Sequence, residues 1–293
     1  MSGNRKKTRD VPRLVYVEKK EDLANLQDLL IYLVEGISIY ANKLKEIEEV
    51  DSSVGRFVCE AMFSTITNVG WDNAKFEEWI NRALKVREDV KERFLAAYKN
   101  KYGKEFSEPL DDAATWTSSN PKDFYEKAKE AGWLRFENED LRSLKQTICF
   151  GVKGICAYAD HAALLGFEDK DIYNFIFEAM AAMTEDLSAD ELLNLVLKTG
   201  EYGVKVMALL DEANTSTYGH PEISEVYLGV RNNPGILISG HDLKDLEELL
   251  EQTKGTGIDV YTHGEMLPAH YYPAFKKIRP LCWELWKLMV APE

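Results

Sequence analysis

The sequence lacks the features that mark membrane, secreted and nucleic-acid-binding proteins. In its 293 residues no apolar run reaches the roughly 18 to 20 residues that a membrane-spanning helix needs. The N-terminal segment is charged and has no apolar signal core. A net charge of -14 repels phosphate backbones, and the only compact basic stretch lies at the very N-terminus. We therefore predict a cytoplasmic protein whose partners include neither nucleic acid nor a membrane.

Cysteine is scarce, and its spacing indicates no metal site. Cys59, Cys149, Cys156 and Cys282 form no C-x-x-C pair and no disulfide framework, which suits a reducing compartment. Cys149 and Cys156 lie on one face of one predicted helix, but two helical turns separate them by roughly 10 Å, which is too far to share one iron. We interpret them as small apolar side chains in a helix interface.

The common phosphate and nucleophile motifs are missing as well. The sequence has no Walker-type phosphate loop, and Gly255-Thr256-Gly257 leads into a strand, whereas a dinucleotide fingerprint leads into a helix. It has no G-x-S-x-G elbow. Nucleotide binding and serine-hydrolase chemistry therefore have no support.

Helical periodicity is abundant, and it extends from Asp22 to about Asn214. Apolar residues recur there at three-and-four spacing. Asp22 is the predicted N-cap of the first helix, and Ser188 with Glu191 forms a predicted capping box. Further helices are predicted at 53–68, 73–101, 121–131, 138–165, 169–184 and 189–212. The stretch 102–121 is rich in turn-forming residues and is predicted to be a loop between two helical bundles.

The period changes after Asn214, where a turn-rich break is followed by short β-rich runs. The predicted strands are Glu225–Val230, Gly235–Ser239 and Ile258–Thr262. An amphipathic helix at Asp242–Thr253 joins the last two, which gives a βαβ unit with a parallel strand pair. Parallel sheets need cover on both faces, and this segment is too short to supply it.

We therefore predict an α-helical N-terminal domain of two helical bundles, followed by an incomplete α/β, Rossmann-like domain. The helical domain is placed at residues 20–214 and the α/β domain at residues 215–277.

Two side chains that can bind metal follow the predicted parallel strands. His241 comes directly after the strand that ends at Ser239, and Glu265 lies just beyond the strand that ends at Thr262. Ligands of open parallel sheets bind outside the carboxyl ends of the strands. Neighbouring strands are roughly 5 Å apart, so an imidazole and a carboxylate, both iron ligands, can share one crevice. Alternatively, His241 caps the following helix and Glu265 is solvated.

The other histidines leave one further alternative open. A mononuclear iron or zinc hydrolase would use His241, Glu265 and His263. His263 and His270 are nearby alternatives, which are otherwise expected to be structural or to support the crevice from outside it. His161, on a core face of a helix, and His220, in a turn, are expected to be structural.

Several long strings resemble the hybrid-cluster protein family, also called prismane proteins or hydroxylamine reductases. These strings are NLQDLLIY from Asn25, YADH from Tyr158, LLDEAN from Leu209, and ILISGHDLKDLEELLEQT with DVYTHGEMLPAH between Pro234 and Pro273. The resemblance covers residues 20–277, which correspond to about the first half of a family member. It implies a helical domain followed by two α/β domains, with a mixed iron-sulfur-oxygen cluster between them.

The resemblance also implies an activity and a set of ligands. The family reduces hydroxylamine to ammonia or handles nitric oxide in nitrosative stress, with a redox protein as electron donor. One His and one Glu of its hybrid-cluster ligands match His241 and Glu265, while several cysteines, a glutamate and a lysine belong to the unmatched half. A cubane held by four N-terminal cysteines is also implied, but residues 1–19 contain no cysteine.

This comparison predicts a truncated oxidoreductase that lacks activity, because most cluster ligands of the family are not in this sequence. The alternative is a non-catalytic helical-bundle fragment with a structural or partner-binding role.

The two ends of the chain, residues 1–19 and 278–293, do not resemble the family. Back-translation with chosen synonymous codons recovers family-like strings in shifted reading frames, such as Gly-Cys-Thr-Lys-Ala-Gly-Val-Cys-Gly-Lys from Arg9 to Lys19. We therefore hypothesise single-base insertions at adenine runs, which would make both ends, including Cys282, products of frame shifts. Resequencing the gene tests this, because uninterrupted reads with an expressed 293-residue product would contradict it.

Overall fold

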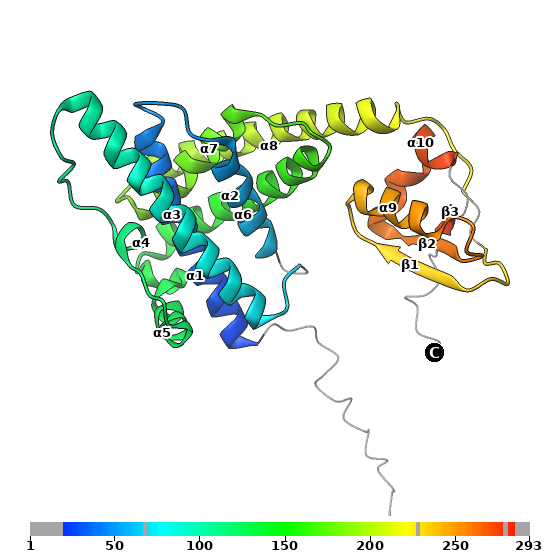
Figure 1. The fold of residues 1–293 in the computed structure, drawn as a ribbon, viewed down its shortest axis with the longest axis horizontal. Coiled ribbons are helices and arrows are strands. Elements are labelled where there is room, and N and C mark those ends of the chain that lie inside the picture. Colours follow the sequence, from blue (N-terminus) through cyan, green and yellow to red (C-terminus); the bar gives the residue numbers. More distant parts are fainter. Residues whose placement is uncertain (1–19, 67–68, 227–228, 278–280, 285–293) are drawn as a thin grey trace, which may run out of the picture.

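The computed structural model describes residues 20–66, 69–226, 229–277 and 281–284. A large helical part and a small α/β part share the long helix α8 (Figure 1). The α-helices are α1 (Glu21–Leu44), α2 (Ser52–Ser64), α3 (Asn73–Tyr102), α4 (Asp112–Thr115), α5 (Pro121–Ala131), α6 (Glu139–Leu164), α7 (Lys170–Ala181), α8 (Ala189–Tyr218), α9 (Leu243–Thr253) and α10 (Pro273–Lys276). The short 3-10 helices are η2 (Trp133–Arg135), η3 (Ala182–Thr184) and η4 (Gly264–His270). No helix among the described residues is long and apolar enough to cross a lipid bilayer.

The predicted long helices are confirmed, with differences at their ends. The Ser188 capping box is present, since the Ser188 amide donates to Glu191 Oε2 at 2.8 Å and the Glu191 amide donates to Ser188 Oγ at 3.4 Å. Asp22 as the N-cap of α1 is wrong, because that helix already begins at Glu21, so Asp22 lies in the first turn, where its charge favours the helix dipole. Helix α8 continues past the predicted end to Tyr218, whose ring is buried in the α/β part.

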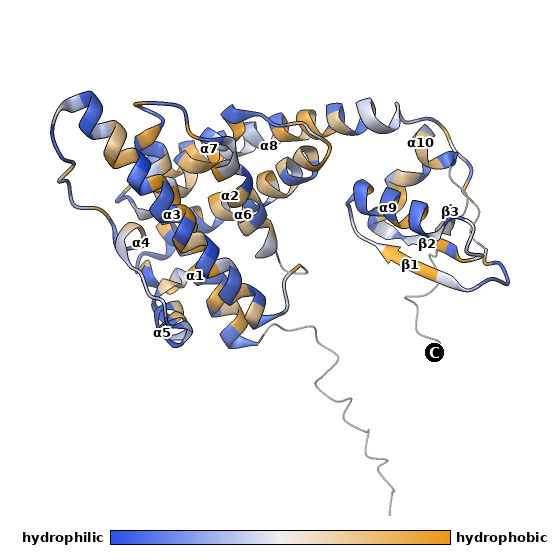
Figure 2. Cartoon of the chain, viewed as in Figure 1, coloured by the Kyte–Doolittle hydropathy of each residue, from blue (hydrophilic) through white to orange (hydrophobic). Residues whose placement is uncertain are grey.

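One hydrophobic core joins the long helices, and their division into two bundles stays a prediction. Helix α1 joins them, because it is buried on nearly all sides and contacts α2, α3, α4, α5 and α7. The predicted loop at 102–121 does not divide the domain, because its one helical turn, α4, packs against α1. Helix α3 lies outside α1 and buries a single stripe, and its other residues are largely hydrophilic (Figure 2).

Gly36 on α1 allows the closest of these approaches. A Cβ atom at this position would lie 2.0 Å from the backbone oxygen of Ala113 in α4. The same oxygen accepts a hydrogen bond of 2.7 Å from Nη1 of the buried Arg87. Glycine is therefore required here for space.

A buried ion pair crosses the helical core. Glu35 on α1 is fully buried, and both of its carboxylate oxygens lie 2.6 Å from Nη2 of Arg135 in η2. The guanidinium of Arg135 also lies over the rings of Tyr32 and Phe136, at 5.0 and 4.6 Å from their centroids. Burial raises the pKa of Glu35 to about 7, although Arg135 acts to lower it.

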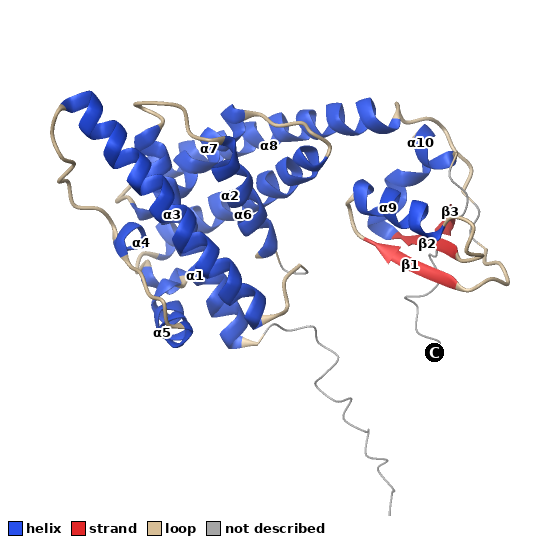
Figure 3. Ribbon diagram, in the orientation of Figure 1, coloured by secondary structure: helices blue, strands red, loops and turns tan. Residues whose placement is uncertain are grey.

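The α/β part contains the predicted βαβ unit. Strands β1 (Gly235–Ser239), β2 (Asp259–His263) and β3 (Leu281–Glu284) form a parallel sheet in that order, with α9 as the crossover between β1 and β2 (Figure 3). Tyr218 from α8 packs into the small core between α9, η4 and α10. The helical part and the sheet thereby share a hydrophobic contact.

Two predictions about this part of the chain need comment. The predicted strand at Glu225–Val230 is wrong for its described residues, which are not in a strand; Val230 is 64% exposed and thus has no apolar surface to pack against. The ends expected to be frame-shifted, 1–19 and 278–293, lie outside the described residues except for Leu281–Glu284, which form β3.

Candidate metal-binding site

The parallel pairing of β1 and β2 brings His241 and Glu265 together, as the sequence predicts. Ser239 at the end of β1 is paired with His263 at the end of β2, so the chain leaves both strands at the same edge. His241 Nε2 then lies 2.7 Å from Glu265 Oε2. Both side chains are more than half exposed, at 60% and 66%. An imidazole nitrogen and a carboxylate oxygen are thus accessible to a ligand at one point.

The local backbone explains how His241 is oriented. Gly240 has a φ of 144°, which an L side chain rarely adopts, and the chain turns there between β1 and α9. Asp242 is the N-cap of α9, because its Oδ1 accepts from the amides of Lys244 and Asp245 at 2.7 and 3.2 Å. The alternative in which His241 caps this helix is therefore wrong, and its imidazole is left to face Glu265.

The pair opens into a cleft of about 1080 Å³ between α6, α8 and the α/β part. One end of the cleft is polar, and its residues are His161, Ser239, His241, Asp242, Asp245 and Glu265. The rest is mostly apolar or glycine-lined, with Thr147 and Thr199 among residues from α6, from α8 and from the end of α2 onward. The size suits a small ligand or a cofactor.

His161 is the site residue that the sequence analysis missed. It was expected to be structural, but α6 places it on the cleft wall, with its ring edge-on to Phe63 at 5.3 Å between centroids. Burial lowers the pKa of His161; the charge of Asp242 acts to raise it and that of His241 to lower it. The helical period assigns His161 to an inward face but does not indicate that this face borders a cleft.

The other histidines lie outside this cleft. His270 is partly buried, its Nε2 is 2.7 Å from Thr262 Oγ1, and burial lowers its pKa. Its structural or supporting role stays a prediction. His263 Nδ1 is 3.5 Å from Ser239 Oγ, which is a long contact. His220 is exposed in the turn after α8. Within the described ranges, no group of three His, Cys, Asp or Glu side chains is placed to hold a metal ion.

The cysteines confirm the interpretation as small apolar side chains. Cys59 on α2, and Cys149 and Cys156 on α6, are free and buried in the helical core. Burial raises the pKa of the Cys149 thiol to about 12, and burial with a hydrogen bond to Cys59 raises that of Cys156. Protonated, enclosed thiols do not bind metal readily.

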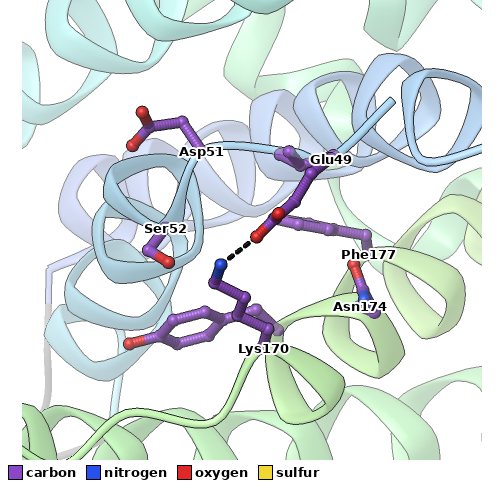
Figure 4. Close-up of a pocket in the computed structure, with 8 residues that line it drawn as sticks. Glu49, Asp51, Ser52, Lys170, Asn174 and Phe177 are labelled. Carbon is purple, nitrogen blue, oxygen red and sulfur yellow. Dashed lines mark hydrogen bonds and ion pairs between the residues drawn. The ribbon is translucent and has the colours of Figure 1, made fainter. Parts of the chain in front are cut away.

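A smaller hollow of about 390 Å³ lies between the start of α2 and α7. Its charged groups are satisfied internally, because Lys170 is paired with Glu49 (Figure 4) and Asp51 accepts the amide of Ser53 at 2.8 Å as the cap of α2. The one described lysine that lines this hollow is thus neutralised by a neighbouring carboxylate. The cleft at His241 is therefore the better candidate site.

Residues 18–285 match the model of the Prismane/CO dehydrogenase family. The chain belongs to this family. The chain is 60% identical over 260 residues to the hydroxylamine reductase of Halothermothrix orenii, and the match covers 88% of this chain and 47% of that protein. It is 59% identical over 259 residues to the hydroxylamine reductase of Nitratidesulfovibrio vulgaris, with the same coverage, and 50% identical over 280 residues to that of Clostridium botulinum, covering 89% and 49%.

This prismane-family chain therefore spans about half the length of the curated relatives it matches. The resemblance to hybrid-cluster proteins inferred from the sequence strings is confirmed. The helical part, the cleft and the βαβ unit all lie within the matched region.

Proposed function

We propose that this chain carries two ligands, His241 and Glu265, of the iron-sulfur-oxygen cluster of a hydroxylamine-reductase-type oxidoreductase. The observation that carries the proposal is the approach of His241 Nε2 to Glu265 Oε2, at 2.7 Å, where two parallel strands end at a large cleft. The name of the relatives, hydroxylamine reductase, supports hydroxylamine as the substrate. Ammonia as the product, a redox protein as the electron donor and nitric oxide as the alternative substrate are further parts of the proposal.

The residues present fit one side of such a cluster. Imidazole and carboxylate both bind iron, and the cleft provides room beside them. Iron-sulfur clusters also need thiolates, and the described cysteines are enclosed in the helical core away from the cleft. The described residues therefore do not complete a ligand set, and the proposal assigns to this chain only the His–Glu side of the site.

The other residues of the cleft have simpler roles in this proposal. Asp242 fixes the turn that orients His241, since it caps α9. His161 and Asp245 contribute polar groups to the cleft beside the pair, while α6 and α8 supply its largely apolar walls. A cluster, when bound, would pass electrons from the donor protein to an N–O substrate and offer the open coordination position for it. We expect the 293-residue chain alone to show no turnover with hydroxylamine.

Iron binding tests the ligand pair directly. We expect the purified chain, titrated with Fe²⁺ under anaerobic conditions, to bind iron at this cleft, and His241→Ala to weaken that binding by at least about tenfold, since even outer-shell partners of metal sites contribute that much. Equilibrium dialysis with iron analysis measures the affinity. His220→Ala is the matched control, because it removes an exposed histidine outside the cleft. Equal affinity for His241→Ala and the unchanged protein would remove the basis of the proposal.

A partner-binding role without catalysis is the second candidate, and exposed apolar side chains favour it. Leu197 and Val204 on α8 are 67% and 64% exposed. Exposed apolar surface of this kind commonly marks an interface. Stoichiometric iron and sulfide in the anaerobically purified chain would exclude an inert fragment. We infer the cytoplasm as the compartment, because the described cysteines are free thiols.

A further inference from the structure

A small hollow of about 20 Å³ lies beside His241, where α6, α8 and the turn before α9 meet. Its apolar lining is Leu165, Leu210 and Leu243, and its polar lining is His161, Asn214, His241, Asp242 and Lys244. His161 belongs to α6 and Asn214 to α8, so side chains from three elements face one point. The hollow adjoins the large cleft, because His161, His241 and Asp242 line both.

The size and the lining of this hollow suit one bound water molecule. A water needs about 10 to 15 Å³ of such space and roughly two to four polar partners. The volume of about 20 Å³ meets the first condition. His161, His241 and Asp242 meet the second, since imidazole nitrogens and carboxylate oxygens all form hydrogen bonds with water. The three leucines confine the molecule without competing for those bonds.

The ring of His161 has nitrogens to offer to such a water. Among the described residues, the histidine rings in a hydrogen bond or an ion pair are those of His241, His263 and His270. His161 contacts Phe63 ring to ring, at 5.3 Å between centroids, which satisfies no nitrogen lone pair. A partly buried imidazole normally has a polar partner, and the hollow provides room for one.

The ring of His241 has one nitrogen placed and one left. Its Nε2 lies 2.7 Å from Glu265 Oε2, so Nδ1 remains for another partner. Asp242 caps α9 through Oδ1, which leaves its Oδ2 as well. The charges of His241 and Asp242 both act on the pKa of His161, which shows that the three side chains are neighbours. One water molecule in the hollow can therefore reach all three.

We propose that His161 is a positioning residue, which holds the imidazole of His241 through one water molecule in this hollow. A metal-binding histidine is commonly fixed by a hydrogen bond at its second nitrogen, and here that nitrogen is Nδ1. Water can donate to Nδ1 or accept from it, so it serves the ring both when Nε2 pairs with Glu265 and when Nε2 binds iron. The role rests on the proposed function, because it takes His241 as an iron ligand.

Nuclear magnetic resonance of the metal-free chain tests the water bridge. The sequence has 5 histidines, so isotope labelling of histidine nitrogen gives few signals to assign. In the unmodified chain, the ring protons of His161 and His241 should show Overhauser cross-peaks with the sign of a long-lived bound water. In His161→Leu, the Nδ1 signal of His241 should move toward that of an imidazole without a hydrogen bond. His161→Gln should keep the signal near its original position, because its amide can bond the same water.

Iron affinity tests the positioning. His161→Leu should weaken the binding of Fe²⁺ by at least about tenfold in anaerobic equilibrium dialysis, as is usual when an outer partner of a metal ligand is lost. His161→Gln should recover most of that affinity, which a general loss of packing would not allow. Phe150→Leu is the matched control, because it replaces an exposed ring of the same helix outside the cleft. Its affinity should equal that of the unmodified chain.

Each measurement has an outcome that would overturn the proposal. These outcomes are an unmodified chain without the bound-water cross-peaks, an unchanged Nδ1 signal in His161→Leu, or equal iron affinity in His161→Leu. The cross-peaks need no variant, so they decide the bridge even if His161→Leu fails to fold. If the unmodified chain binds no iron, the proposed function fails, while the cross-peaks still decide the bridge. If His241→Ala weakens iron binding and His161→Leu does not, the proposed function stands and His161 has no positioning role.

Discussion

Arg135→Ala is expected to lower the free energy of unfolding by about 3 kcal/mol, because it leaves the carboxylate of Glu35 buried without its partner. The pair is bidentate at 2.6 Å, and the Glu35 side chain is only 1% exposed. Protonation of Glu35 limits the loss, since its pKa is already raised to about 7 by burial. Urea denaturation at pH 7 measures the change.

The pH dependence of stability shows whether Arg135→Ala acts through the charge of Glu35 or only through lost packing. The ordinary pKa of Glu35 is 4.5, and its folded value is about 7. Between these pH values, Glu35 has lost its proton in the unfolded chain but keeps it in the folded chain. The contribution of Glu35 to the free energy of unfolding is therefore fully present below pH 4.5 and is lost as the pH rises through 7. Glu35→Gln should remove that decline, whereas Arg135→Ala should extend it to higher pH.

An exposed ion pair provides the control for Arg135→Ala. Lys75→Ala breaks the exposed pair with Glu78 on α3 and should leave the unfolding midpoint unchanged, because solvent screens such pairs. A loss for Arg135→Ala no larger than that for Lys75→Ala would show that the buried pair contributes nothing to stability.

Gly36→Ala should lower the free energy of unfolding by roughly 2 to 3 kcal/mol, the range of overpacked cores. The added methyl would lie 2.0 Å from the backbone oxygen of Ala113. Neither atom can rotate away, because the methyl is attached directly to the backbone of α1 and the oxygen belongs to the backbone of α4. Separating α1 from α4 would also disturb the hydrogen bond from Arg87 to that oxygen. Denaturation of the purified variant measures the loss.

The same substitution elsewhere should have the opposite sign. Gly154 is an exposed residue inside α6, with no atom within 4 Å of an added Cβ. Alanine there should stabilise the chain by about 0.5 to 1 kcal/mol, since it restricts the unfolded state and favours the helix. If Gly36→Ala were as stable as Gly154→Ala, the close approach of α1 and α4 would not be a constraint in solution.

The sequence predicts the elements whose causes are local. The Ser188 box and the α9 amphipathic pattern depend on residues within one or two turns, and both are present. The central place of α1 depends on several helices at once, although its run of apolar residues around Tyr32 to Tyr40 is the signal of an enclosed helix.

The candidate site shows the same division. His241 and Glu265 could be predicted, because a general rule of parallel sheets relates two strand ends that are near in sequence. His161 could not, because its position on the cleft depends on how α6 meets α8 and the sheet across many residues. The Glu35–Arg135 pair has no signal in the sequence either, since 100 residues separate its members.

Helix α8 also connects the helical core to the core of the α/β part. Its first turns pack in the helical core, its last residue, Tyr218, is fixed in the core of the α/β part, and its 30 residues span about 45 Å. Over that length a rotation of about 5° about the first turn would move the far end by roughly 4 Å. The position of His241 relative to α6 therefore depends on the direction of one helix. A substitution at Leu192, in the first turn of that helix, can alter the width of the cleft.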